Sequence, residues 1–185
     1  MNGRLRKFVL TTHIACSVGW LGAVAASLAL AVAGLISSDP AVVRAVYLTM
    51  ELMGWTVLVP LSLASLLTGL VQALGSRWGL LRHYWVVAKL LLNLVAITVL
   101  LLYMQTLGVL ADTATQGGSG SDLGELQNPS PVVHGGAAVL LLLVATGLSV
   151  YKPTGMTRYG QRKQQEQRPQ PRQHEQPVAS AATEP

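Results

Sequence analysis

Residues 77–93, RWGLLRHYWVVAKLLLN, change from a basic, aromatic turn into an apolar helix. The apolar sequence continues well beyond Asn93, and about 20 apolar residues are enough to cross a bilayer as a helix. Arg77 and Arg82 precede this helix, as basic residues do on the cytoplasmic side of a membrane span. Yet Lys89 and Asn93 lie inside it, and polar groups at membrane depth are costly enough to suggest a function.

The whole chain has the composition of a multi-pass membrane protein. Of its 185 residues, 51% are hydrophobic and only 11% are charged, whereas about a quarter of a soluble domain is charged. We read the formal net charge of +5 as a sign of loop orientation. We therefore expect the lipid bilayer, and no nucleic acid, as partner. The single cysteine, Cys16, excludes an internal disulfide and a cysteine-based zinc site.

Four apolar spans predict an all-α fold, a four-helix transmembrane bundle. Backbone groups in lipid must hydrogen-bond within their own segment, so each span is predicted to be helical. The predicted spans are 8–36, 47–74, 84–111 and 132–151, within a transmembrane domain of residues 1–157. Pro60 is expected to kink the second span. Residues 158–185 are basic and rich in Gln and Pro, and they are predicted to be a disordered tail.

The connections between the spans differ in character. Residues 37–40 (SSDP) are predicted to end one helix and start the next, and residues 76–79 to form a tight hairpin. Residues 112–131 predict a long, flexible loop with a Gly and Ser centre.

The basic residues predict the orientation of the bundle. They gather before the first span, between the second and third, and after the fourth, whereas the other two connections contain Arg44 alone. Four spans with cytoplasmic N- and C-termini satisfy the positive-inside rule at every connection. We therefore expect a protein of the plasma membrane. Residues 4–7 and the apolar run after them resemble a signal peptide, with residues 31–33 as a cleavage site. Because the run is longer than a typical signal peptide and three spans follow it, we expect it to remain as the first span.

Helical periodicity sorts the polar residues by face and depth. On the first span, His13 shares a face with Cys16, Ser17 and Trp20. On the second and third spans, polar residues recur at steps of three and four. The sequence predicts an inner polar cluster of His13, Ser65, Thr68, Lys89 and Asn93, and a weaker outer cluster of Glu51 and His134.

Each of these residues has a structural and a functional interpretation. Lys89 either extends to the cytoplasmic headgroups or faces the bundle and neutralises an anionic carboxylate or quinone oxygen. His13 is either hydrogen-bonded across the bundle or an axial ligand of a metal or haem. Ser65 and Thr68 are more typical of close helix packing than of a binding site.

The spacing of these residues also resembles a known group of proteins. The resemblance rests on His13-x6-Trp20-x-Gly22, Met50-Glu51, Pro60, Gly69 and Trp85-x3-Lys89. A broad group of small bacterial membrane proteins is similar in these positions, including HemJ-type protoporphyrinogen oxidases and CopD-type copper-resistance domains. The resemblance to the oxidases implies a b-type haem, with His13 as its ligand and Lys89 as a charged site residue.

A second resemblance covers nearly the whole chain up to Gly160. The stretches SLLTGLVQALGSRWGLLRHYWVVAKLLLN and GLSVYKPTGMTRYG are similar to an uncharacterised family of predicted integral membrane proteins from high-GC bacteria. This likeness implies a membrane location and no particular activity. The chain departs from the oxidases in having no basic residue late in the first span.

Three functions stay open at this point. The first is a haem-b redox protein that acts on a quinone or porphyrinogen, with a cofactor site of His13, Trp20, Ser65, Thr68, Lys89 and Asn93. The second is copper handling, with His13, Cys16, Met50 and Met53 as ligands. The third is a non-catalytic membrane component that retains a protein partner through its basic tail.

Overall fold

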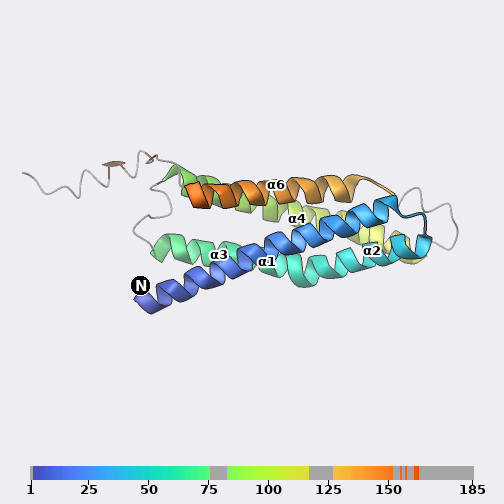
Figure 1. The fold of residues 1–185 in the computed structure, drawn as a ribbon, viewed down its shortest axis with the longest axis horizontal. Helices are drawn as coiled ribbons and strands as arrows, with labels where there is room; N and C mark the ends of the chain where they lie inside the picture. The colour runs from blue at the N-terminus through green and yellow to red at the C-terminus, as the bar shows by residue number, and fades with distance from the viewer. Residues whose placement is uncertain are drawn as a thin grey trace, which may run out of the picture.

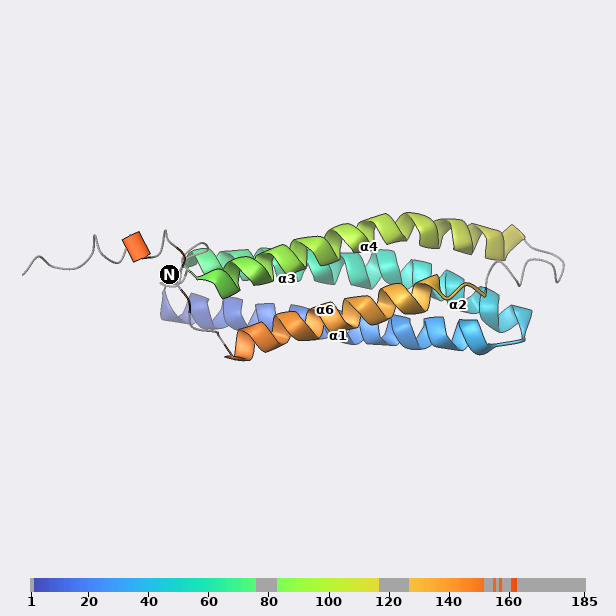
Figure 2. The same ribbon diagram turned by 90° about the horizontal axis from the view of Figure 1, so that it is seen from above.

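The computed structural model describes residues 2–75, 83–116 and 127–151, together with 155, 157, 161 and 162. Its long elements are all helical. In chain order they are α1 (Gly3–Ile36), α2 (Pro40–Met53), the π-helical turn η1 (Gly54–Leu58), α3 (Val59–Gly75), α4 (Tyr84–Gln116) and α6 (Ser130–Tyr151). Figures 1 and 2 show these helices side by side along one axis. The predicted all-α bundle is confirmed.

Four helices are long and apolar enough to cross a membrane, with α2, η1 and α3 forming one of them. The 34 residues of α1 span about 51 Å and the 22 residues of α6 about 33 Å. Because the hydrocarbon core of a bilayer is about 30 Å thick, α1 must tilt or extend beyond it. Large apolar side chains such as Phe8, Leu102 and Leu140 are exposed, as lipid-facing surfaces require.

All four membrane-spanning helices extend beyond the spans that the sequence predicts, with α1 beginning at Gly3 and α6 at Ser130. α2 begins at Pro40 rather than at residue 47, because the Asp39 carboxylate accepts the N–H of Ala41 at 2.9 Å and caps the helix. α4 continues to Gln116, so the first residues of the predicted 112–131 loop are helical. The predicted hairpin 76–79, the middle of that loop and nearly all of the predicted tail 158–185 lie outside the described residues.

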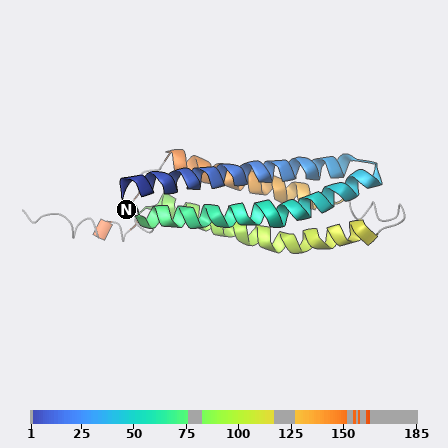
Figure 3. The same ribbon diagram turned by 90° about the horizontal axis from the view of Figure 1, so that it is seen from below.

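The predicted distortion near Pro60 takes the form of a π-helical turn. Proline has no N–H to donate, and its ring clashes with the carbonyl four residues earlier. In η1 the N–H of Val59 bonds to the carbonyl of Gly54, five residues earlier, and this wider turn accommodates the proline. α2 and α3 meet at a bend there (Figure 3).

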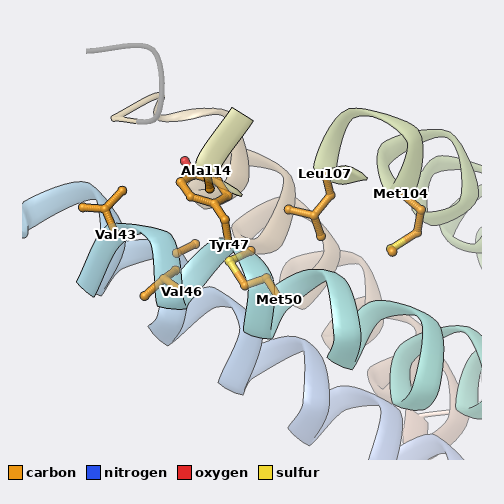
Figure 4. Close-up of a cluster of buried hydrophobic side chains, with 8 residues drawn as sticks. Val43, Val46, Tyr47, Met50, Met104, Leu107 and Ala114 are labelled. Atoms are coloured by element: carbon orange, nitrogen blue, oxygen red, sulfur yellow. The ribbon is translucent and has the colours of Figure 1, made fainter. Parts of the chain in front are cut away.

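The packing of the helices divides the bundle into an apolar and a more polar half. α1 and α4 each contact the α2–α3 span and α6, so they lie at opposite corners of the bundle. At the end where α2 begins, a core cluster joins α1, α2 and α4 (Figure 4): Ala31, Val43, Val46, Tyr47, Met50, Met104, Leu107 and Ala114. A second cluster, around Trp20, lies near the middle. The part of the bundle beyond this cluster contains the start of α1, and we call it the N-terminal half. Its most buried side chains are Ser62 and Ser65.

Candidate functional site

His13 is bound across the contact between α1 and α3. Its Nδ1 lies 3.1 Å from the carbonyl oxygen of Ser65 and 3.1 Å from Oγ1 of Thr68. A carbonyl oxygen only accepts hydrogen bonds, so Nδ1 must carry the proton. The Thr68 hydroxyl donates to the carbonyl of Ala64 at 2.6 Å, which leaves its oxygen free to accept from Nδ1. In the neutral ring, Nε2 then keeps an open lone pair.

Small residues leave room for the His13 ring between α1 and α3. A side-chain carbon on Gly69 would lie 3.0 Å from Cε1 and 3.4 Å from Nδ1 of the ring, so the imidazole occupies the space above this glycine. Beside it, the hydroxyl oxygens of Ser17 and Ser65 are 2.8 Å apart. We call His13, Ser17, Ser65, Thr68 and Gly69 the His13 layer. The sequence analysis placed His13 and Ser17 on one face of the first span and grouped His13 with Ser65 and Thr68, but it did not indicate that Gly69 receives the ring.

Lys89 makes its hydrogen bond to a different helix. Its Nζ donates to Oγ of Ser149 on α6, a residue that the sequence analysis did not single out. One turn further along α4, Oδ1 of Asn93 is buried and has no hydrogen-bond partner among the described residues.

The two residues of the predicted outer cluster have separate surroundings. The His134 ring stacks on Tyr103, with 4.3 Å between ring centroids and 18° between ring planes. Its Nδ1 lies 2.9 Å from the carbonyl of Ser130. The Glu51 carboxylate lies close to Gly108 of α4, since a side-chain carbon added to this glycine would be 3.6 Å from it. In the described part of the chain, no hydrogen bond joins Glu51 to His134.

The described residues do not assemble a metal site from protein ligands alone. Among residues 2–75, 83–116 and 127–151, no group of three His, Cys, Asp or Glu side chains could hold a metal ion. Cys16 is half-buried and carries a free thiol. Met50 packs in the core cluster at the opposite end of the bundle from His13. The structure therefore gives no support to the copper ligand set His13, Cys16, Met50 and Met53.

An apolar cavity of about 190 Å³ lies between α1, α2, α4 and α6. Its walls are mostly aliphatic, and Trp20, Met50, Tyr103 and His134 are the larger side chains that line it. The Trp20 side chain is 3% exposed, and its Nε1 has no hydrogen-bond partner within the described ranges. His13 does not line this cavity. This cavity was not predicted from the sequence, because a cavity depends on how side chains from four helices meet.

Comparisons with known proteins give no assignment. No protein-family model matches the chain, and neither a curated protein nor a solved structure matches it. The fold itself defines the class of protein: a multi-pass, four-helix membrane bundle. Within that class, a more specific function must be inferred from the His13 layer and the cavity.

Proposed function

We propose that the protein is a redox component of the plasma membrane in which His13 serves as an axial ligand of a b-type haem. The observation that carries the proposal is the hydrogen bond of Nδ1 to the Ser65 carbonyl. A histidine that ligates a metal through one ring nitrogen usually donates the other N–H to a carbonyl or carboxylate, which fixes the tautomer and orients the ring. His13 has this arrangement, and its Nε2 makes no hydrogen bond within the described residues.

The number of protein ligands favours haem over a bare copper ion. A porphyrin supplies four nitrogen ligands of its own, so one or two side chains complete the site. Copper bound by the protein alone needs several ligands at one place, and the described residues provide no group of three. A single oriented histidine between α1 and α3 is therefore sufficient for haem, but not for a copper ion bound by the protein alone.

The surrounding residues have defined tasks in this proposal. The Ser65 carbonyl and the Thr68 hydroxyl hold the His13 ring, and Gly69 leaves it room. Lys89 supplies a positive charge in the same half of the bundle for an anionic carboxylate or quinone oxygen. When bound, the haem would supply one-electron transfer, and we infer a quinone or porphyrinogen as the small-molecule partner.

The spectrum of the purified protein is expected to show this haem. After expression with ample haem supply, the wild type should have a Soret band and sharp α and β bands on reduction with dithionite. His13→Ala should lose these bands, because it removes the ligand. His134→Ala is the matched control and should keep them, since His134 contacts Tyr103 and Ser130 instead. A wild type with protein absorption only, or bands that survive in His13→Ala, would refute the proposal.

The orientation of the bundle is part of the same proposal. We place both termini in the cytoplasm, because Arg4, Arg6 and Lys7 are exposed at the start of α1 and basic residues stay on the cytoplasmic side. This puts the His13 layer in the cytoplasmic half of the membrane and the cavity in its outer half.

Fusions to reporter proteins test this orientation. A fluorescent protein fused at the C-terminus should fluoresce, whereas alkaline phosphatase fused there should be inactive, because its disulfides form only in an oxidising compartment. Alkaline phosphatase inserted between α4 and α6 should be active. The reverse pattern of activities would place the termini outside the cytoplasm.

A further inference from the structure

The first turns of α1 project beyond the end of the neighbouring helix α6. Gly135 of α6 packs against Leu28 of α1, and α6 ends at Tyr151, about 24 Å further along its axis. The same distance back along the antiparallel α1 reaches Thr12, so residues 3–11 of α1 extend past α6 (Figure 2). Because α6 is about as long as the hydrocarbon core is thick, these residues lie at the level of the headgroups.

One face of this extension is basic and the other is apolar. We call a run of five exposed side chains the basic segment: Arg4, Leu5, Arg6, Lys7 and Phe8. At about 100° per residue, its three cations lie within an arc of about 160° around the helix. Leu5 and Phe8, which are 50% and 69% exposed, lie in the remaining arc. A helix with one basic and one apolar face is typical of contact with a membrane surface.

The described residues supply no counter-charge for these three cations. No ion pair joins the basic segment to another residue in the described ranges, and the acidic side chains there, Asp39, Glu51 and Asp112, lie toward the other end of the bundle. Residues 158–185 contain more basic than acidic side chains, and a second copy of the chain presents the same positive face. Because like charges repel, the basic segment fits an anionic partner from outside the chain.

We propose that the basic segment binds the headgroups of anionic phospholipids. Arg4, Arg6 and Lys7 contact the phosphate oxygens, for which a guanidinium group is suited because it can donate two parallel hydrogen bonds. Leu5 and Phe8, on the other face, contact the hydrocarbon just below. A phospholipid offers phosphate and hydrocarbon side by side, and α1 itself holds the segment at the membrane surface, where such lipids are already present.

Two lipids with the same acyl chains test the charge requirement. Phosphatidylglycerol is anionic, whereas phosphatidylcholine has no net charge. Native mass spectrometry of the detergent-purified full chain gives the dissociation constant of the first bound molecule of each lipid. The wild type should prefer phosphatidylglycerol by at least about five-fold, the contribution of one basic residue near an anionic surface. Equal binding of both lipids would overturn the proposal, and so would displacement of phosphatidylglycerol by an equal concentration of inorganic phosphate or of a short duplex DNA.

Substitutions then locate the bound lipid. The triple variant Arg4→Gln, Arg6→Gln and Lys7→Gln removes the three charges and keeps long polar side chains, so the preference for phosphatidylglycerol should fall to less than about two-fold. The triple variant Arg4→Lys, Arg6→Lys and Lys7→Arg is the matched control, because it keeps all three charges, and it should retain the preference. An unchanged preference in the glutamine variant would assign the lipid to another basic region and contradict the proposal.

These experiments are independent of the haem proposal. The substituted side chains are all exposed, so the melting temperature of each variant should equal that of the wild type. Lys7 is about 9 Å from His13 along the axis of α1, so the haem spectrum should be unchanged as well. Equal binding of the two lipids by a wild type that shows the Soret band would refute the lipid inference alone.

Discussion

Ser65→Leu is expected to cost about 3 kcal/mol of folding stability, the upper end of the usual range for overpacked cores. Ser65 is 2% exposed, and its hydroxyl lies 2.8 Å from that of Ser17 on α1. A leucine needs space that the contact between α1 and α3 does not contain, so the two helices must separate. The separation also breaks the hydrogen bond between His13 and the Ser65 carbonyl, and we expect the haem spectrum to be lost with it.

The cost is attributed to the size of the new side chain rather than to the lost hydroxyl. Ser65→Ala removes the hydroxyl and keeps the small volume, so it should cost only about 0.6 kcal/mol, the mean for hydrogen bonds between membrane helices. Thr56→Leu is a matched control on the same span, because Thr56 is exposed and a leucine there faces lipid. Its stability should stay within about 0.5 kcal/mol of the wild type.

Stability is measured by thermal unfolding in detergent, followed by circular dichroism. The expected order of melting temperatures is wild type and Thr56→Leu together, Ser65→Ala slightly lower, and Ser65→Leu far lower. If Ser65→Ala were as unstable as Ser65→Leu, the hydroxyl rather than the volume would hold α1 against α3. Our interpretation of Ser65 as a close-packing residue would then be wrong.

The sequence predicted the fold because the membrane restricts the choice of structure. Long apolar runs must be helical in lipid, so their number and approximate position follow from composition. The residues that face each other are harder to predict. Periodicity placed Ser65 and Thr68 on one face and His13 at a similar depth, and the structure joins them by hydrogen bonds. The hydrogen bond of Lys89 to Ser149 was not foreseen, because periodicity gives a face and not the neighbouring helix.

Two local features show where reasoning from the sequence stopped. Pro60 predicted a distortion of the second span, and the structure contains a π-helical turn there. Whether such a distortion takes the form of a kink or of a π-helical turn depends on the helices packed around it. The pairing of Tyr103 with His134 joins residues of α4 and α6, which are connected by a segment whose conformation no motif specifies. The cavity beside them arises from small gaps between four helices and has no signature in any one of them.

The second large effect concerns Lys89, whose replacement should change stability and haem retention in opposite directions. Within the described residues Lys89 forms no ion pair, and its hydrogen bond goes to the neutral hydroxyl of Ser149. An unpaired charge costs about 3 kcal/mol at the centre of a membrane helix and less near its end. The bond to Ser149 returns only about 0.6 kcal/mol. Lys89→Met should therefore stabilise the apoprotein by about 1 kcal/mol.

Haem retention should fall in the same variant. If Lys89 binds an anionic oxygen of the cofactor or its partner, the lost charge-assisted hydrogen bond is worth about 1.5–3 kcal/mol, or about 10–100-fold in affinity. Lys89→Arg keeps the charge and should retain most of the haem. Ser149→Ala keeps the charge as well, and it should lose only about 0.6 kcal/mol of stability. Haem content is measured from the Soret band and stability from thermal unfolding.

The sign of the stability change decides between the two interpretations of Lys89. If Lys89 serves to hold α4 against α6, Lys89→Met should be less stable than the wild type, and its haem content should be unchanged. Ser149→Ala should then show the same loss of folding stability. If Lys89 serves to bind an anion, Lys89→Met should be more stable than the wild type and should contain less haem. The wild-type site then holds an unpaired charge for its ligand, and this charge lowers the folding stability of the apoprotein. Asn93 lies one turn from Lys89 on α4, and its buried Oδ1 has no hydrogen-bond partner among the described residues. It is a second uncompensated polar group in the same half of the bundle, and it favours the interpretation that Lys89 binds an anion.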